Sequence, residues 1–185
     1  QLIIDMRETL GIDTVITAYG LSETCGLVTM CRQGDPAEVI AQTSGRAIPD
    51  VEVGIMRPDG TLAAPHEAGE IVVRGFNIMQ CYFNDERATR ETIDPAGWLH
   101  TGDIGNLDES GNIRITDRLK DMFISGVFNC YPAEIENQLL HHDAIAQAAV
   151  VGMSDERMGE VGAAVVVNTP GAGISDYALL VGCRD

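Results

Sequence analysis

Lysine is nearly absent from this sequence. Lys120 is the only lysine among 185 residues, and the other eleven of the 12 basic side chains are arginines. The 12 basic residues face 28 acidic ones, which gives a formal net charge of −16. A nucleic-acid groove or a patch that binds anionic membranes needs clustered Lys and Arg. The composition therefore argues against both kinds of surface, and a reaction that requires two lysines cannot occur within these residues alone.

Long apolar runs and cysteine pairs are also missing. No stretch approaches the roughly 20 apolar residues that cross a bilayer. Residues 1–7, Gln-Leu-Ile-Ile-Asp-Met-Arg, lack the charged-then-apolar order of a secretory signal. The five cysteines are odd in number and have no Cys-x-x-Cys spacing, so they indicate neither a disulfide framework nor a zinc site. We expect a cytoplasmic protein with reduced thiols.

The residues that are present predict a globular chain with a real core. Hydrophobic residues make up 45% of the sequence and charged residues 22%. Short β-branched runs separated by turns over residues 51–116 predict a mainly antiparallel sheet. A polar helix over residues 85–92, which Asn84 or Asp85 could cap, interrupts that sheet.

The segments on either side of this sheet have other patterns. Helical spacing predicts a helix over residues 2–10, and Thr14–Ala18 is interpreted as a buried strand of a parallel α/β unit. After the sheet we expect a hairpin-like stretch at 121–129, a helix starting near Pro132, strands at 145–151 and 163–167, and a helix at 176–183. The fold class is therefore mixed α/β and α+β, and the domain boundary is predicted around Arg118–Asp121.

The loop after Ala18 carries the first group of chemically useful side chains, Tyr19-Gly20-Leu21-Ser22-Glu23-Thr24. Ligands collect at the carboxyl ends of strands in parallel α/β units. The ring of Tyr19 can cover a purine, the Ser22 hydroxyl can donate to a phosphate oxygen, and the Glu23 carboxylate can hold Mg²⁺. A polar loop with a solvated Glu23 would account for the same residues.

A second group is Trp98-Leu99-His100-Thr101-Gly102-Asp103. The Asp103 carboxylate could accept both hydroxyls of a ribose cis-diol, because its two oxygens match the two donors. The alternative is that Gly102-Asp103 is simply a turn. His100 has no nucleophile nearby in the sequence, so we interpret it as a loop or packing residue rather than a base.

With a third group, these motifs resemble the adenylate-forming (AMP-binding) superfamily, which includes acyl-CoA synthetases, firefly luciferase and the adenylation domains of peptide synthetases. The third group comprises Thr116–Gly126 and Tyr131-Pro132-Ala133-Glu134-Ile135-Glu136. The resemblance runs from Thr14 to the end of the chain. Further support comes from Ser44-Gly45-Arg46, from Gly69–Gly75 and from Asp155–Glu160. The wording of the second and third groups is most similar to that of bacterial fatty-acyl-CoA ligases.

The resemblance implies a fold and a reaction. Residues 1–118 would be the end of a large α/β plus β-barrel-like AMP-binding domain, and residues 119–185 a small α+β lid domain. A fatty or related acid would attack the α-phosphate of ATP, and the thiol of coenzyme A would then displace AMP from the acyl-adenylate. The implied roles are adenine contact for Tyr19, phosphate contact for Ser22, Mg²⁺ binding for Glu23, ribose binding for Asp103 and Arg118, a hinge at Lys120, and room for the pantetheine arm at Gly126.

The sequence also departs from the family pattern. The family's phosphate-binding Ser/Thr/Gly loop would lie upstream and its adenylation lysine downstream, so we expect a C-terminal fragment that is inactive alone. Cys81 and Val127 stand where the family has glycines, and their side chains could narrow a tunnel or strain a turn. Two alternatives stay open: an adenylation domain that loads a carrier protein, and a truncated, non-catalytic nucleotide-binding or interaction module.

Overall fold

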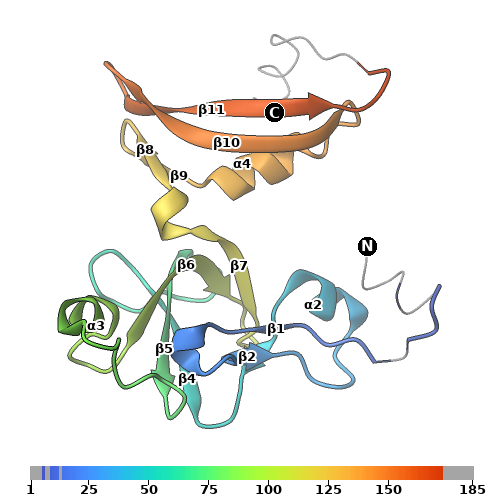
Figure 1. Cartoon of the computed structure of the whole chain (residues 1–185). Coiled ribbons are helices and arrows are strands. Elements are labelled where there is room, and N and C mark those ends of the chain that lie inside the picture. The colour runs from blue at the N-terminus through green and yellow to red at the C-terminus, as the bar shows by residue number, and fades with distance from the viewer. Residues whose placement is uncertain (1–5, 7–8, 13, 173–185) are drawn as a thin grey trace. The chain divides into compact units, whose positions relative to one another are not determined.

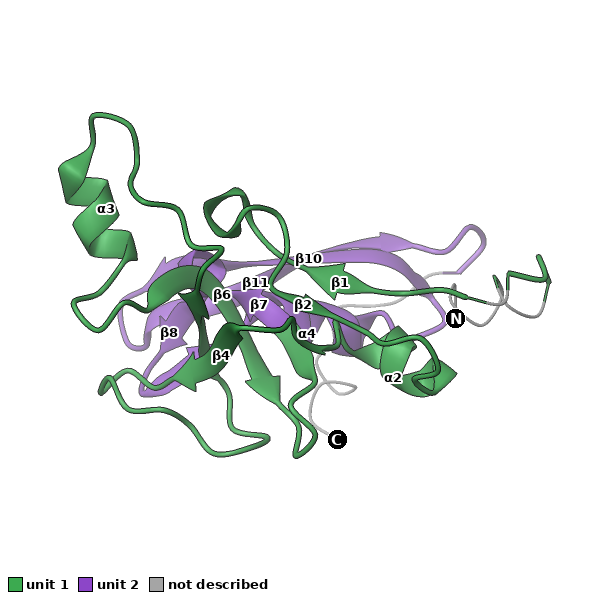
Figure 2. Cartoon of the chain, turned by 90° about the horizontal axis from the view of Figure 1, so that it is seen from below, with its two compact units in different colours: residues 1–115 green, residues 116–185 purple. Residues whose placement is uncertain are grey.

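The computed structural model describes residues 6, 9–12 and 14–172 of the chain. The chain divides into two compact units, residues 1–115 and 116–185 (Figures 1 and 2). The division falls inside one strand, β7 (Ile113–Arg118), three residues before the boundary that the motifs predict. The assignment of residues 1–118 and 119–185 to the two domains of an enzyme stays a prediction.

Two sheets are formed by the part of the first unit that the structure describes. The small sheet has the order β1 (Ala18–Tyr19), β2 (Thr29–Met30) and β3 (Arg46–Ala47), with antiparallel neighbours. A 3₁₀ turn, η1 (Ser22–Thr24), lies between β1 and β2, and helix α2 (Ala37–Gln42) lies between β2 and β3. The larger sheet has the order β4 (Val51–Met56), β5 (Gly69–Gly75), β6 (Leu99–Leu107) and β7, and it is open rather than closed into a barrel.

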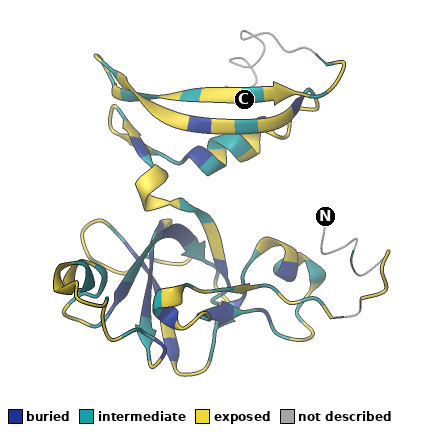
Figure 3. Cartoon of the chain, viewed as in Figure 1, coloured by how far each residue is buried: buried dark blue, intermediate teal, exposed yellow. Residues whose placement is uncertain are grey.

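The larger sheet has a buried cluster of apolar side chains on each face, because neighbouring residues along its strands point to opposite faces. In β5, Ile71 and Val73 point into one cluster with Val28, Val51, Ile55 and Ile113, whereas Val72 lies in a second cluster with Met56 and Trp98. Side chains two positions apart share a face of a strand, which explains this split. Figure 3 shows buried positions concentrated on this sheet. The antiparallel sheet predicted over residues 51–116 is therefore confirmed.

Helix α3 (Glu86–Thr92) follows β5 and begins as the sequence predicts. Asp85 is its N-cap residue, and the Asp85 side chain accepts a hydrogen bond from the Ala88 N–H at 2.8 Å. That bond satisfies one of the first amides, which have no partner within their own helix.

The described residues of the second unit, up to residue 172, form a four-stranded sheet with one helix packed on it (Figure 1). The strand order is β10 (Ile145–Asp155), β11 (Gly159–Asn168), β8 (Phe123–Ser125) and β9 (Phe128–Cys130). Helix α4 (Pro132–Leu139) starts at the predicted proline, and a short 3₁₀ turn, η2 (Leu119–Asp121), precedes β8. Phe123, Leu139, Ile145 and Val150 form the buried core between helix and sheet.

Three expectations are either wrong or fall on residues that the structure does not describe. The predicted buried strand at 14–18 is wrong: only Ala18 belongs to a strand, Thr14 and Ile16 are exposed, and β1 pairs with β2 antiparallel. The apolar residues of this segment suggest a strand, but the conformation depends on contacts with distant residues. The carbonyl of Thr17, for example, accepts a hydrogen bond from the N–H of Cys31. Most of the predicted helix at 2–10 lies outside the described residues, and the predicted helix at 176–183 lies wholly outside them. None of the described helices combines the length and the apolar character needed to cross a bilayer.

Candidate active site

The turn at residues 19–27 is a tightly specified piece of backbone. A Cβ at Gly20 would clash with the carbonyl group of Gly26, so this position requires glycine. Thr24 is fully buried, and its Oγ1 donates to the carbonyl of Leu21 and accepts from the N–H of Leu21, both at 3.0 Å. These contacts close the 3₁₀ turn without using the side chains of Ser22 and Glu23. The Ser22 side chain is exposed, and that of Glu23 is half-buried.

The structure brings together Tyr19 and Asp103, two residues that the sequence assigns to one nucleotide. Asp103 lies in β6 and is only 8% exposed, and its Oδ2 accepts a hydrogen bond from the Tyr19 hydroxyl at 2.7 Å. A hydrogen bond to an ionised carboxylate is among the stronger ones in proteins. The hydrogen bond joins the turn after β1 to strand β6, across 84 positions of the sequence.

Glu23 is held by a residue that the sequence analysis missed. The Tyr82 hydroxyl donates to Glu23 Oε1 at 2.8 Å, and the N–H of Met79 donates to the Glu23 carbonyl at 2.8 Å. Burial raises the pKa of Tyr82, and the hydrogen bond to Glu23 raises it further. No local pattern marks Tyr82, because its partner lies 59 positions earlier in the chain.

A hollow of about 290 Å³ opens beside Glu23, and three carboxylates line it: Glu23, Glu70 and Glu91. Glu70 is engaged by His100 Nδ1 at 2.7 Å and by the N–H of Gly102 at 3.0 Å. Glu91 forms an ion pair with Arg87 at 2.7 Å. Glu23, by contrast, has the neutral Tyr82 hydroxyl as its hydrogen-bond donor, so its charge is not offset by that partner.

A single carboxylate, that of Glu23, is compatible with a metal ion that is bound mainly by a nucleotide. Within the described part of the chain, no group of three or more His, Cys, Asp or Glu side chains is placed to hold a metal. Mg²⁺ in phosphate-handling sites is typically bound through one or two carboxylates together with substrate phosphates, rather than in a protein cage. A single, aimed Glu23 therefore fits Mg²⁺ that arrives with a nucleotide.

His100 differs from both expected roles. It lies in β6 rather than in a loop, and its half-buried ring contacts Glu70 instead of serving packing alone. Its Nε2 is 3.8 Å from Asp94 Oδ2 on the other side. The ring thus lies between the carboxylates of Glu70 and Asp94.

The remaining predicted site residues belong to the second unit and are placed within it. Arg118 is exposed at the end of β7, and Lys120 is exposed in η2. Gly126 turns the chain between β8 and β9 with φ +65°, a left-handed conformation that favours glycine. The roles assigned to these three residues stay predictions.

The two residues that replace family glycines are not strained. Cys81 and Val127 are both exposed, and neither has a positive φ. Val127 is 87% exposed, so it is not a core residue of the small domain. Whether either side chain slows a thioester-forming step stays a prediction.

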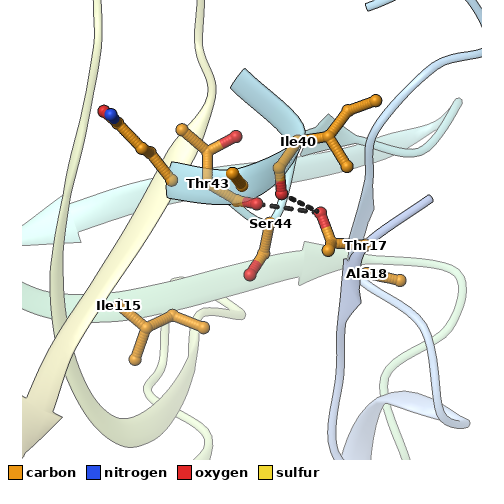
Figure 4. A pocket seen from close by; sticks show the side chains of 8 residues that line it. Thr17, Ala18, Ile40, Thr43, Ser44 and Ile115 are labelled. Carbon is orange, nitrogen blue, oxygen red and sulfur yellow. Dashed lines mark hydrogen bonds between the residues drawn. The ribbon is translucent and has the colours of Figure 1, made fainter. Parts of the chain in front are cut away.

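A second hollow of about 420 Å³ lies beside β1 and α2 (Figure 4). The Thr17 hydroxyl contributes to its wall but is already used, since it contacts the carbonyls of Ile40 at 3.1 Å and Thr43 at 2.9 Å. The lining residues are uncharged: Thr17, Ala18, Ile40, Ala41, Gln42, Thr43, Ser44 and Ile115. The hollow therefore offers no charged anchor for a phosphate or a metal.

Comparison with known proteins shows which family the chain matches. The AMP-binding enzyme family matches residues 1–83, and the family of the AMP-binding enzyme C-terminal domain matches residues 134–181. Over 184 residues the chain is 49% identical to 3-[(3aS,4S,7aS)-7a-methyl-1,5-dioxo-octahydro-1H-inden-4-yl]propanoyl:CoA ligase of Rhodococcus jostii, covering 100% of this chain and 34% of that enzyme. It is 42% identical to 2-succinylbenzoate–CoA ligase of Bacillus cereus, covering 92% of this chain and 34% of that enzyme.

Solved structures give the same result. The o-succinylbenzoate CoA synthetase of Bacillus subtilis, bound to its acyl-adenylate intermediate, matches with a TM-score of 0.82 at 37% identity, over 99% of this chain and 36% of that one. The amide bond synthetase McbA of Marinactinospora thermotolerans matches with a TM-score of 0.82 at 33% identity, over 98% of this chain and 37% of that one.

The fold and the matched regions thus define a portion of an AMP-binding enzyme. The chain belongs to the adenylate-forming (AMP-binding) superfamily. It spans about a third of the length of the curated relatives named above.

Proposed function

We propose that this chain supplies the nucleotide-binding turn, the ribose-binding carboxylate and the lid domain of an ATP-dependent acid–thiol ligase. The observation that carries the proposal is the hydrogen bond between Tyr19 and Asp103, together with Glu23 in the same turn as Tyr19. These three side chains match the needs of an adenine, a ribose and a phosphate-bound Mg²⁺. Coenzyme A is the proposed acceptor because the relatives are named as CoA ligases.

The reaction has two steps. A carboxylate oxygen of the acid attacks the α-phosphorus of ATP, the bond to the β-phosphate oxygen breaks, and pyrophosphate leaves. The thiolate of coenzyme A then attacks the acyl carbonyl, and AMP leaves with the electron pair of the C–O bond. Tyr19 and Asp103 orient the nucleoside, Ser22 donates to phosphate, and Glu23 contributes a ligand to Mg²⁺, which neutralises phosphate charge when it is bound.

The second unit has its own part in the proposal. Arg118 supports the ribose, Lys120 is the hinge about which the lid domain changes position between the two steps, and Gly126 leaves room for the pantetheine arm. A hinge belongs at the boundary of an element, where a few residues absorb the change in φ and ψ. Lys120 lies in such a place, in the short η2 turn between β7 and β8.

The acid is proposed to carry a ring system. The relatives that share 49% and 48% identity with the chain are named for a propanoyl group on a bicyclic dione. Others, at 42%, are named for coumarate and succinylbenzoate. A straight-chain fatty acid is the alternative from the motif wording alone. We place the enzyme in the cytoplasm.

A chimera tests the proposal. In it, this sequence replaces the segment of the Rhodococcus jostii ligase with which it aligns, so that the relative supplies the rest of the enzyme. We expect the chimera to catalyse acid-dependent ATP–pyrophosphate exchange and to form the CoA thioester of that relative's acid. Replacing coenzyme A with simple amines tests the acceptor, because an amide bond synthetase shares the fold. A folded chimera that forms no adenylate would overturn the proposed function.

The 185 residues by themselves should show no exchange. They contain one lysine, and no Ser/Thr/Gly-rich phosphate loop is recognisable among them. Groups that neutralise a transferring phosphoryl centre each contribute several kcal/mol, so the rate should match that of a Glu23→Ala control. Exchange clearly above that control would mean that these residues contain a complete adenylation site.

A further inference from the structure

The segment between β5 and α3 grips the turn that carries Glu23 at three points. The Asn77 side chain donates to the carbonyls of Thr24 at 3.3 Å and Leu27 at 2.7 Å. The N–H of Met79 donates to the Glu23 carbonyl, and the Tyr82 hydroxyl donates to the Glu23 carboxylate, both at 2.8 Å. The bonds from Asn77 and Met79 fix the backbone of the turn. Only the bond from Tyr82 fixes the carboxylate itself.

Tyr82 is anchored well enough to aim another side chain. Its own N–H donates to Thr89 Oγ1 at 2.9 Å, which ties it to α3. That helix is in turn held by its Asp85 cap. The ring is half-buried in the wall of the hollow beside Glu23. The bond to Thr89 therefore fixes the backbone at residue 82, and the half-buried ring presents its hydroxyl to Glu23.

Glu23 needs such a partner. A glutamate side chain has three rotatable bonds, and its immobilisation costs rotamer entropy of the order of 1–2 kcal/mol. Binding Mg²⁺ through a single protein carboxylate requires that the oxygen already point at the metal. A neutral phenol holds Oε1 without cancelling the charge, and it leaves Oε2 as the oxygen available to a metal.

We propose that Tyr82 is a positioning residue, which orients the Glu23 carboxylate so that Oε2 serves as the protein ligand of the nucleotide-bound Mg²⁺. The inference rests on the proposed function. It adds a residue from outside the recognised motifs, 59 positions from the carboxylate it directs.

The test uses Tyr82→Phe in the chimera, a change that keeps the ring and removes the donor. Mn²⁺ replaces Mg²⁺ as the probe, and its binding is followed by the EPR signal of free Mn²⁺ in the presence of a non-hydrolysable ATP analogue. Loss of a hydrogen-bond partner behind a metal ligand commonly weakens metal binding 10–100-fold, so we expect about tenfold weaker Mn²⁺ binding. The Mg²⁺ concentration for half-maximal exchange should rise by a similar factor, whereas metal-free AMP binding should not change.

Tyr131→Phe is the matched control. Tyr131 is also half-buried, but it lies in the second unit just before α4. Its variant should bind Mn²⁺ and the nucleotide as the unmodified chimera does. A double-mutant cycle adds a readout that a purely structural role would not change: in a Glu23→Gln background, Tyr82→Phe should have no further effect on Mn²⁺ binding.

The outcomes separate the two claims. Unchanged Mn²⁺ affinity in Tyr82→Phe, or equal effects of Tyr82→Phe with and without Glu23, would overturn the positioning role while the chimera's activity upholds the proposed function. Loss of AMP binding together with a lower melting temperature would assign Tyr82 to the fold, and it would overturn the inference in the same way. An unmodified chimera that folds but makes no adenylate would overturn both.

Discussion

Asp103, the proposed ribose-binding residue, occupies a nearly buried position in the fold. It lies in β6, and its Oδ2 accepts a hydrogen bond from the Tyr19 hydroxyl. The ribose hydroxyls would add two more donors to the same group.

Asp103→Asn should therefore weaken AMP binding to the chimera by about tenfold, or about 1.4 kcal/mol. Asparagine keeps one acceptor oxygen but replaces the other with a donor, which cannot receive a hydroxyl hydrogen. Isothermal titration calorimetry measures the change. Asp59→Asn, in the exposed turn after β4, removes the same charge as a control. Equal affinity in the Asp103 variant and this control would contradict the ribose assignment.

At the scale of a single element, the turn between β6 and β7 holds a carboxylate whose pKa is lowered by its hydrogen bonds. The Asp108 carboxylate accepts hydrogen bonds from the N–H groups of Ser110 and Asn112 and from the Asn112 side chain, each at 2.8 Å. Burial alone would raise the pKa of Asp108, but the hydrogen bonds from Asn112 and Ser110 outweigh it and hold the pKa below the ordinary value of 3.8.

This lowered pKa predicts how acid affects stability. A carboxylate whose pKa falls on folding stabilises the fold above its unfolded pKa, and this contribution is lost as the pH drops through the folded pKa. Asp108→Asn should lower the free energy of unfolding by about 1.5 kcal/mol at pH 7, and the difference should shrink below about pH 3.8. Thermal unfolding followed by circular dichroism at pH 7 and pH 3 checks this. Glu109→Gln, one exposed residue further on, should show no comparable effect.

At this scale the sequence predicts elements well where the signal is local. Asp85 before α3 and Pro132 at the start of α4 act through neighbouring backbone, so their patterns are visible in a few residues. The segment 14–18 shows the opposite case, because the Thr17 hydroxyl contacts carbonyl groups at residues 40 and 43. The apolar residues beside Thr17 have the composition of a strand, but long-range partners decide the conformation.

In the candidate site too, some features follow from local sequence motifs, and others depend on contacts between distant residues. The order of the motifs predicts that Tyr19 and Asp103 serve one ligand, and the structure joins them across 84 positions. Tyr82 lies between those motifs and shares no spacing with Glu23, so its hydrogen bond to Glu23 becomes visible only in the folded chain. A sequence pattern reports residue types in order, whereas a hydrogen bond between distant residues depends on the whole path of the chain.

At the scale of the whole molecule, the proposed hinge makes a distinct prediction. Proline fixes φ near −65° and removes an N–H, so Lys120→Pro should restrict a backbone change at η2. In the chimera, we expect exchange to remain within about threefold of the unmodified rate and thioester formation to fall at least tenfold, since only the second step needs the new lid position. Lys120→Ala, which leaves the backbone free, should spare both steps. Equal loss of the two steps in Lys120→Pro would make this residue structural rather than a pivot.

Asp117 determines where the chain can be divided for expression. Its Oδ2 accepts the hydrogen bond from the N–H of Ala133 in the first turn of α4 at 2.9 Å, although Asp117 lies before the boundary that the motifs predict. A gene that encodes the small domain from Leu119 onward would delete this cap, at a cost of about 1 kcal/mol. A gene that starts at Thr116, where the compact unit begins, would retain it. The shortest version of this domain that keeps its helix fully capped therefore begins inside the last strand of the preceding sheet.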